Sequence, residues 1–235
     1  MSGSFVTPEL RARIRALMTP IAVGLGRLGL SPNALTVIGF LIAVVAAAAA
    51  AAQLWLPAGL LVIFGGVFDL FDGALARATG RVSKLGAFMD STFDRWGEGV
   101  VYIGLAIGCL GEGFQLGAVL AAAAMSSAFM VSYTRAKAES LGFAPGRGMA
   151  NVGLAPREVR LVILTAGLVL AGIVGTGNPL LALETWSLPL GIELVKPWAG
   201  QIWLFWSLLL ITVLATITTI QRIVATLRQA AASDG

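Results

Sequence analysis

Long apolar runs separated by short polar segments make up most of the chain. The apolar runs cover residues 31–52, 58–79, 85–110, 114–141, 157–175 and 201–228. Each is close to or longer than the roughly 20 residues that a helix needs to cross a hydrocarbon core of about 30 Å. The pattern therefore predicts an all-α integral membrane protein with six transmembrane helices.

A different pattern precedes the first apolar run. Residues 8–30 mix basic and apolar side chains at helical spacing, which predicts an amphipathic helix lying on the membrane surface. Ser31 and Pro32 suit the N-cap and first position of the helix that follows. Because no internal repeat or second domain is visible, we expect one membrane domain over residues 1–235, with the six-helix bundle at 31–228.

Composition supports a membrane protein and indicates its orientation. Hydrophobic residues make up 57% of the chain and charged residues 12%, which is too apolar for an ordinary soluble domain. The net charge of +4 comes from basic residues that fall almost entirely on one predicted side, and Lys196 is the only one clearly opposite. Since basic residues favour the cytoplasmic side, this distribution predicts a cell-membrane protein with both termini in the cytoplasm, and it argues against nucleic-acid binding.

The aspartates are concentrated in one short stretch. Four of them, Asp69, Asp72, Asp90 and Asp94, border or interrupt apolar runs, and only Asp234 lies elsewhere. An uncompensated charge in a membrane helix costs roughly 2.5–3.5 kcal/mol on insertion scales. Spacings of three and four residues place each pair on one helix face, so two packed helices would bring the four carboxylates together.

Carboxylates without any histidine in the chain favour hard, oxygen-bound cations. The candidates are Mg²⁺ and, as a second possibility, Mn²⁺, and four negative charges match two such ions. Pairs of divalent ions held by carboxylates recur in enzymes that carry out displacement at phosphorus. The cluster would lie near the cytoplasmic face.

The stretch resembles the signature of the CDP-alcohol phosphotransferase family. That signature reads D-x2-D-G-x2-A-R-x8-G-x3-D-x3-D, and this chain has every fixed residue at its expected spacing: Asp69, Asp72, Gly73, Ala76, Arg77, Gly86, Asp90 and Asp94. The resemblance implies transfer of a phosphatidyl group from CDP-diacylglycerol to an alcohol, with release of CMP. It also implies a homodimer, the usual state of the family.

The resemblance assigns the carboxylates individual roles. It implies that Asp69, Asp72 and Asp90 bind metal, and that Asp94 binds metal and is the general base for the attacking hydroxyl. Residues expected to contact the CDP-lipid are Asn33, Thr36, Gly73, Ala76, Arg77, Ser83 and Gly86.

Basic residues at the cytoplasmic ends of the last three spans suggest a phosphorylated acceptor. The residues expected to bind the acceptor phosphate are Arg135, Lys137, Arg157, Arg160 and Arg222. The segments around them resemble the bacterial branch that makes phosphatidylinositol phosphate, although the two basic residues of Ser132-Tyr-Thr-Arg-Ala-Lys-Ala-Glu139 are exchanged relative to that branch. We therefore expect inositol phosphate as acceptor.

Three alternatives remain at this point. Glycerol 3-phosphate would also suit a basic pocket, and intramembrane carboxylates also mark ion-coupled transporters. A transporter would more often show repeats and acidic residues near the middle of the membrane, neither of which is present. A membrane scaffold would have no use for the aspartates.

Overall fold

The computed structural model describes residues 8–143, 152–174, 186–187, 193–194 and 200–233. This part of the chain is almost entirely helical, in agreement with the predicted all-α class. The helices are α1 (Pro8–Arg27), α2 (Pro32–Ala51), α3 (Trp55–Ala78), α4 (Lys84–Gly111), α5 (Gln115–Ser140), α6 (Arg157–Val174) and α7 (Gln201–Ser233). Two antiparallel two-residue strands, β1 (Trp186–Ser187) and β2 (Glu193–Leu194), complete the elements.

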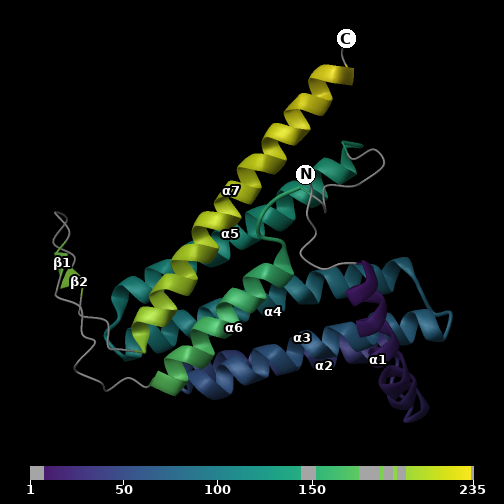
Figure 1. Cartoon of the computed structure of the whole chain (residues 1–235), viewed down its shortest axis with the longest axis horizontal. Coiled ribbons are helices and arrows are strands. Elements are labelled where there is room, and N and C mark those ends of the chain that lie inside the picture. Colours follow the sequence, from purple (N-terminus) through teal and green to yellow (C-terminus); the bar gives the residue numbers. More distant parts are fainter. Residues whose placement is uncertain (1–7, 144–151, 175–185, 188–192, 195–199, 234–235) are drawn as a thin grey trace.

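The helices form two packed groups joined at α6 and α4. Helix α2 packs against α3 and α4, and α5 packs against α7. Helix α6 contacts both α3 and α7, and α4 contacts α5, so these contacts hold the two groups together (Figure 1). The chain reverses direction between α3 and α4 and again between α5 and α6. The start of α6 lies next to the aspartate stretch, since Arg157 contacts Asp69.

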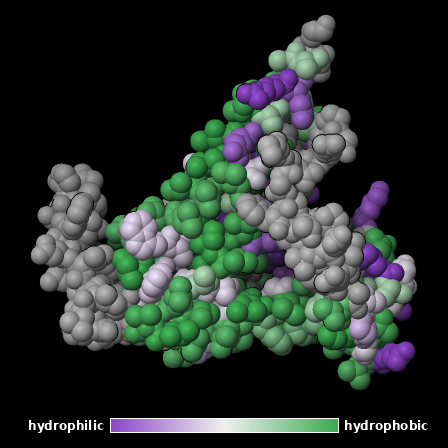
Figure 2. Space-filling view, viewed as in Figure 1, coloured by the Kyte–Doolittle hydropathy of each residue, from purple (hydrophilic) through white to green (hydrophobic). Residues whose placement is uncertain are grey.

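Large apolar side chains cover the outside of the bundle. Leu41, Ile63, Ile107, Val162 and Val213 are among many that are exposed. Figure 2 shows apolar residues along the flanks of the helices, with hydrophilic residues gathered toward the C-terminal end of α7 and the end of the lower bundle near α1. A soluble monomer rarely exposes so large an apolar area, and contact with lipid accounts for it.

By length and composition alone, four of the described helices qualify as membrane spans: α2, α3, α5 and α7. The chain is thus a multi-pass membrane protein. Helices α4 and α6 were also predicted to span, but polar residues interrupt their apolar stretches: Asp90, Asp94 and Glu98 in α4, and Arg157 and Arg160 at the start of α6. The helix boundaries follow the predicted spans closely, except that α3 begins three residues earlier and α7 continues five residues further.

Helix α1 packs on the bundle through one face. Met18, Ala22 and Leu25 contact an apolar cluster that includes Leu75 of α3, while Leu17 and Leu28 remain exposed. The side chains of Arg11, Arg13 and Arg15, part of the predicted amphipathic pattern, lie outside the described residues, as do Arg147 and Lys196.

Small residues allow α2 and α4 to approach closely. A Cβ atom added to Gly104 or Gly108 of α4 would collide with the backbone carbonyl oxygens of Ala47 or Ala50 in α2. Both alanines are buried. Membrane helices gain little from the hydrophobic effect against lipid, so close packing of this kind holds them together.

We predict that Gly104→Ala destabilises the protein, because the added methyl forces α2 and α4 apart. Overpacking of this kind costs roughly 1–3 kcal/mol of unfolding free energy. Thermal unfolding in detergent should show a lower midpoint for Gly104→Ala. The matched control is Gly66→Ala in α3, where an added Cβ meets nothing within 4 Å. Equal midpoints for the two variants would contradict this account of the packing.

Candidate active site

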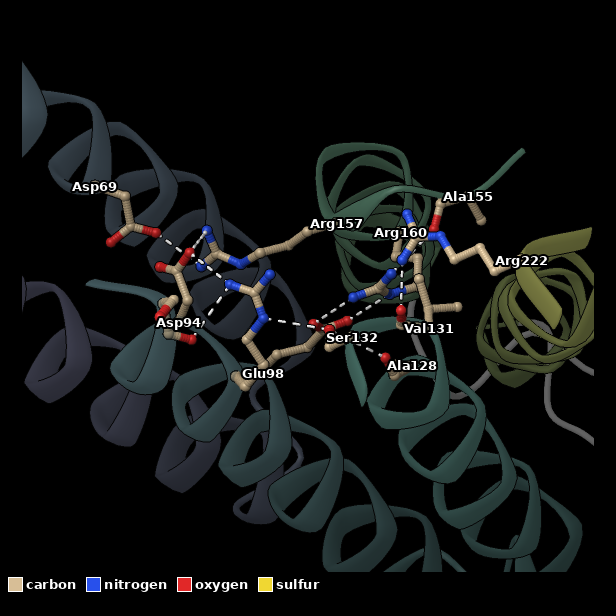
Figure 3. A network of polar contacts seen from close by, with 12 residues as sticks. Asp69, Asp94, Glu98, Ala128, Val131, Ser132, Ala155, Arg157, Arg160 and Arg222 are labelled. Atoms are coloured by element: carbon tan, nitrogen blue, oxygen red, sulfur yellow. Dashed lines mark hydrogen bonds and ion pairs between the residues drawn. The ribbon is translucent and has the colours of Figure 1, made fainter. Parts of the chain in front are cut away.

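Two aspartates from different helices meet at one arginine. Arg157, the first residue of α6, places Nη2 2.7 Å from Asp69 Oδ2 of α3 and Nη1 3.0 Å from Asp94 Oδ2 of α4. All three side chains are largely buried, with 13–21% of their surface exposed. Figure 3 shows the Arg157 guanidinium between the two carboxylates. The predicted convergence of the two halves of the signature is therefore present for this pair.

Asp72 is buried one turn beyond Asp69 and is held from α2. The Thr36 hydroxyl donates a hydrogen bond to Asp72 Oδ2 at 2.7 Å, and both residues are buried. Ser31 caps α2 by accepting a hydrogen bond from the Ala34 amide, as predicted, and this fixes the turn that carries Thr36. Thr36, expected at the CDP-lipid, thus lies against the aspartate cluster.

Asp90 is half-buried, one turn before Asp94 on α4. It interacts electrostatically with Asp69 and Arg157, and Asp72 in turn interacts with Asp69 and Asp90. The four signature carboxylates therefore share one region, although no three acidic, cysteine or histidine side chains among the described residues already form a metal-binding group.

These residues fit the implied divalent ions by their chemistry. All the donors are carboxylate oxygens, which Mg²⁺ and Mn²⁺ prefer. Asp69 and Asp94 approach from separate helices and already share a single positive group, the Arg157 guanidinium. Both carboxylates therefore face the same positive charge, although their oxygens contact different nitrogens of it.

Glycines border the carboxylates, including one that was not predicted. A Cβ on Gly39 of α2 would lie 2.9 Å from Asp69 Oδ1, so a side chain at this position would force that carboxylate to move. The side chain of Arg77, which is exposed, folds over Gly73, whose added Cβ would lie 3.1 Å from Arg77 Nη1. Gly39 precedes the signature by thirty residues, and nothing local in the sequence marks it.

The remaining residues expected at the CDP-lipid lie at the beginnings of α2 and α4. Ser83 caps α4 by accepting a hydrogen bond from the Gly86 amide at 3.0 Å. A Cβ on Gly86 would lie 3.5 Å from Asn33 Oδ1, so the two helix starts are neighbours. Ala76 is half-buried on α3.

The basic residues predicted to hold the acceptor phosphate have different surroundings. Only Arg157 contacts the aspartates. Arg160 is buried against Glu98 of α4, and Arg222 is buried with its guanidinium donating to the carbonyl oxygens of Val152 and Val131.

The other two predicted cations are on α5. Arg135 pairs with Glu139 at 3.0 Å, and Lys137 is exposed. Arg222 interacts electrostatically with Arg135 and Arg160, so these side chains form one positively charged region, in which Glu139 and Glu98 pair with Arg135 and Arg160.

Arg95, which follows the last signature aspartate, links α4 to α5. It donates hydrogen bonds to Asp94 Oδ2 at 3.2 Å and to Ser132 Oγ of α5 at 3.2 Å. Its neighbour Trp96 is mostly exposed and packs against Phe40 of α2, with ring centroids 4.9 Å apart. Sequence reasoning left both residues unassigned.

An apolar cleft leads to the carboxylates. Its walls come from α2, α3, α4 and α6, and include small and apolar residues such as Gly65, Ala43 and Leu161. Asp69, Asp94, Glu98 and Arg157 form its polar part. The cleft therefore combines mostly small and apolar walls with a group of charged side chains.

The chain is similar in sequence to known proteins. The chain matches the model of the CDP-alcohol phosphatidyltransferase family over residues 29–196. It is 36% identical to the phosphatidylinositol phosphate synthase of Streptomyces avermitilis over 95% of this chain and 83% of that protein. It is 37% identical to the archaetidylinositol phosphate synthase of Pyrococcus horikoshii over 66% of this chain and 78% of that protein.

Solved structures of a related enzyme have a similar fold. The phosphatidylinositol phosphate synthase of Mycobacterium tuberculosis with CDP-DAG bound is 27% identical, with a TM-score of 0.71 over 90% of this chain and 94% of that one. The same enzyme in complex with manganese and citrate gives a TM-score of 0.69 over 89% of this chain and 88% of that one. The family model covers more than half of the chain and includes the whole aspartate signature, so neither a transporter nor a scaffold describes it, and the chain belongs to the CDP-alcohol phosphatidyltransferase family of enzymes.

Proposed function

We propose that this enzyme transfers the phosphatidyl group of CDP-diacylglycerol to inositol phosphate, producing phosphatidylinositol phosphate and CMP. The observation that carries the proposal is the meeting of Asp69, Asp94 and Arg157 at the polar end of an apolar cleft. Such a site suits a donor with lipid tails and a charged pyrophosphate. The acceptor is supported by the names of several relatives, which are phosphatidylinositol or archaetidylinositol phosphate synthases.

The reaction would be an in-line displacement at the phosphorus that carries diacylglycerol. The acceptor hydroxyl oxygen forms the new bond to phosphorus, the bond to the CMP oxygen breaks, and CMP leaves. Asp94 would accept the hydroxyl proton, since the chain has no histidine and Asp94 is the partly exposed acid that lines the cleft on α4. Asp69, Asp72, Asp90 and Asp94 would hold two Mg²⁺, or Mn²⁺. When bound, these ions neutralise phosphate oxygens and stabilise the leaving group.

The donor and acceptor would occupy different sides of the cluster. We assign the CDP moiety to the starts of α2 and α4 and the end of α3, through Asn33, Thr36, Gly73, Ala76, Arg77, Ser83 and Gly86. We assign the acceptor phosphate to the positively charged region on α5, α6 and α7, where Arg157 is the cation closest to the carboxylates. Arg135, Lys137 and Arg222 would extend that region.

The membrane arrangement is part of the proposal. Exposed apolar residues such as Ile103 and Ile107 of α4 and Ile173 of α6 support spanning by these two helices as well, for six spans in one domain. Helix α1 would lie at the interface, with Leu17 and Leu28 toward lipid. The distribution of positive charges along the sequence supports a cytoplasmic location of the site and of both termini at the cell membrane. Family resemblance supports a homodimer.

The first prediction from this proposal concerns the acceptor. Purified protein with CDP-diacylglycerol and Mg²⁺ should release CMP when given inositol 1-phosphate, but not with glycerol 3-phosphate, free inositol or serine. Asp94→Asn should lower the rate at least about 100-fold, because it removes the proton acceptor and a metal ligand. Glu112→Gln, a carboxylate change at the other end of α4, is the matched control. Turnover with glycerol 3-phosphate alone would overturn the assigned acceptor.

A second prediction concerns the shared cation. Arg157 occupies the oxygens of Asp69 and Asp94 that a divalent ion would use, so Arg157→Ala should tighten Mn²⁺ binding. The same change should raise the KM for inositol phosphate about tenfold or more, because charge-assisted hydrogen bonds contribute roughly 1.5–3 kcal/mol. Electron paramagnetic resonance of free Mn²⁺ measures the first effect, and steady-state kinetics the second.

Two controls separate these effects. Arg157→Lys keeps the charge but loses the two-pronged geometry, and should give intermediate values. Arg228→Ala, an exposed cation near the end of α7, should change neither quantity. Unchanged Mn²⁺ affinity in Arg157→Ala would mean that this side chain does not compete with the metal.

A further inference from the structure

A second ion pair lies directly behind the first. Arg160 of α6 donates from Nε to Glu98 Oε1 at 2.8 Å and from Nη2 to Glu98 Oε2 at 2.7 Å. Its third nitrogen, Nη1, donates to the carbonyl oxygen of Ala155 at 3.0 Å. Both charged side chains are only 1% exposed. Figure 3 shows this two-pronged pair beside the Arg157 contacts.

The two pairs form successive rungs between the same helices. Glu98 follows Asp94 by four residues on α4, and Arg160 follows Arg157 by three residues on α6, so each pair of like residues lies on one helix face. The rung at Asp94 and Arg157 is partly exposed, whereas the rung at Glu98 and Arg160 is almost fully enclosed, with each side chain 1% exposed and Glu98 bordering the cleft. The enclosed rung therefore fixes how α6 sits against α4.

The segment that leads into α6 is held as well. The hydroxyl of Thr218 on α7 accepts hydrogen bonds from the amides of Leu154 and Ala155 at 3.0 and 2.9 Å. Because Ala155 also accepts the third hydrogen bond of Arg160, the start of α6 is fixed to α4 and α7 together. Arg157 lies between these attachments.

Stability alone does not explain a buried ion pair. Removing two charges from water is costly, and apolar replacements of similar volume are often neutral or stabilising. What the pair supplies here is a defined register and a defined direction for the helix that carries Arg157. Each Arg160 nitrogen already has a partner, so this side chain is not the one that receives a phosphate.

We propose that Glu98 and Arg160 are positioning residues, which set the register of α6 so that Arg157 meets Asp69 and Asp94 and is presented to the acceptor phosphate. This assignment rests on the proposed function for its acceptor, but not for its effect on the metal. It replaces the expectation that Arg160 binds the acceptor phosphate directly.

The test is a double-mutant cycle between Glu98→Gln and Arg157→Ala. Glu98→Gln keeps the shape of the side chain but weakens the pair, so Arg157 should be held less firmly. We expect a rise of about tenfold in the KM for inositol phosphate, a small change in the KM for CDP-diacylglycerol, and tighter Mn²⁺ binding. In an Arg157→Ala background, Glu98→Gln should change neither the acceptor KM nor Mn²⁺ affinity further.

An apolar replacement separates positioning from folding. The double variant Glu98→Leu with Arg160→Met should keep a thermal midpoint close to that of the unaltered protein, yet show the same loss of acceptor affinity. Glu112→Gln, which changes the half-buried carboxylate that follows α4, serves as the control. Additive effects of the Glu98 and Arg157 changes, or an unchanged acceptor KM in the double apolar variant, would overturn the proposal.

The two readouts distinguish which idea fails. If no inositol phosphate is consumed, the proposed acceptor is wrong, but the Mn²⁺ titrations of the same four cycle variants still test the positioning pair. If turnover occurs and the Mn²⁺ affinities are additive, the positioning pair is wrong and the proposed function stands.

Discussion

Buried charge in an apolar bundle has to be paired, and the structure at this site follows from that requirement. Asp69 and Asp94 belong to different helices, and the Arg157 guanidinium contacts both, while Arg95 also donates to Asp94. Asp72 is satisfied by the Thr36 hydroxyl from a further helix. Because an unpaired buried charge is so costly, these contacts determine which ends of α2, α3, α4 and α6 meet. The same contacts bring Asp69, Asp72 and Asp94 into one region, and Asp90 borders it.

Polar contacts and small residues make different contributions to helix packing. At the end of the bundle away from the aspartates, Glu112 accepts hydrogen bonds from Trp55 at 2.9 Å and from Gln201 at 2.8 Å, and joins α4 to α3 and α7. Between the two ends, glycines of α4 such as Gly104 press against the α2 backbone. Apolar helices have no strong preference for one register in lipid. The polar contacts at the ends supply that preference, and the small residues between them allow close approach.

The sequence was sufficient to predict features that depend on local spacing. The aspartate pairs on single helix faces and the Ser31 cap needed only helical periodicity and residue type, whereas the Ser83 cap of α4 was not predicted. Glu98 was missed although it lies four residues after Asp94, because its partner is on another helix and pairing across helices is a tertiary property. Gly39 was missed for the same reason, because the atom that a side chain at this position would meet belongs to Asp69 on α3. Helices α4 and α6 lack uninterrupted apolar runs because they carry the charges that form the site.

Arg157 and Arg160 illustrate why residue type cannot assign function in such a site. They are three residues apart on one helix and carry the same group, yet one is 21% exposed and the other 1%. A bidentate pair with 1% of its side-chain surface exposed is suited to holding a position rather than to exchanging its partner. A partly exposed pair that borders a cleft can give up one carboxylate in return for a metal ion or a phosphate. The exposed fraction of the side chains rises from Glu98 and Arg160 to Asp94 and Arg157. We therefore expect the first pair to stay fixed and the second pair to take part in binding.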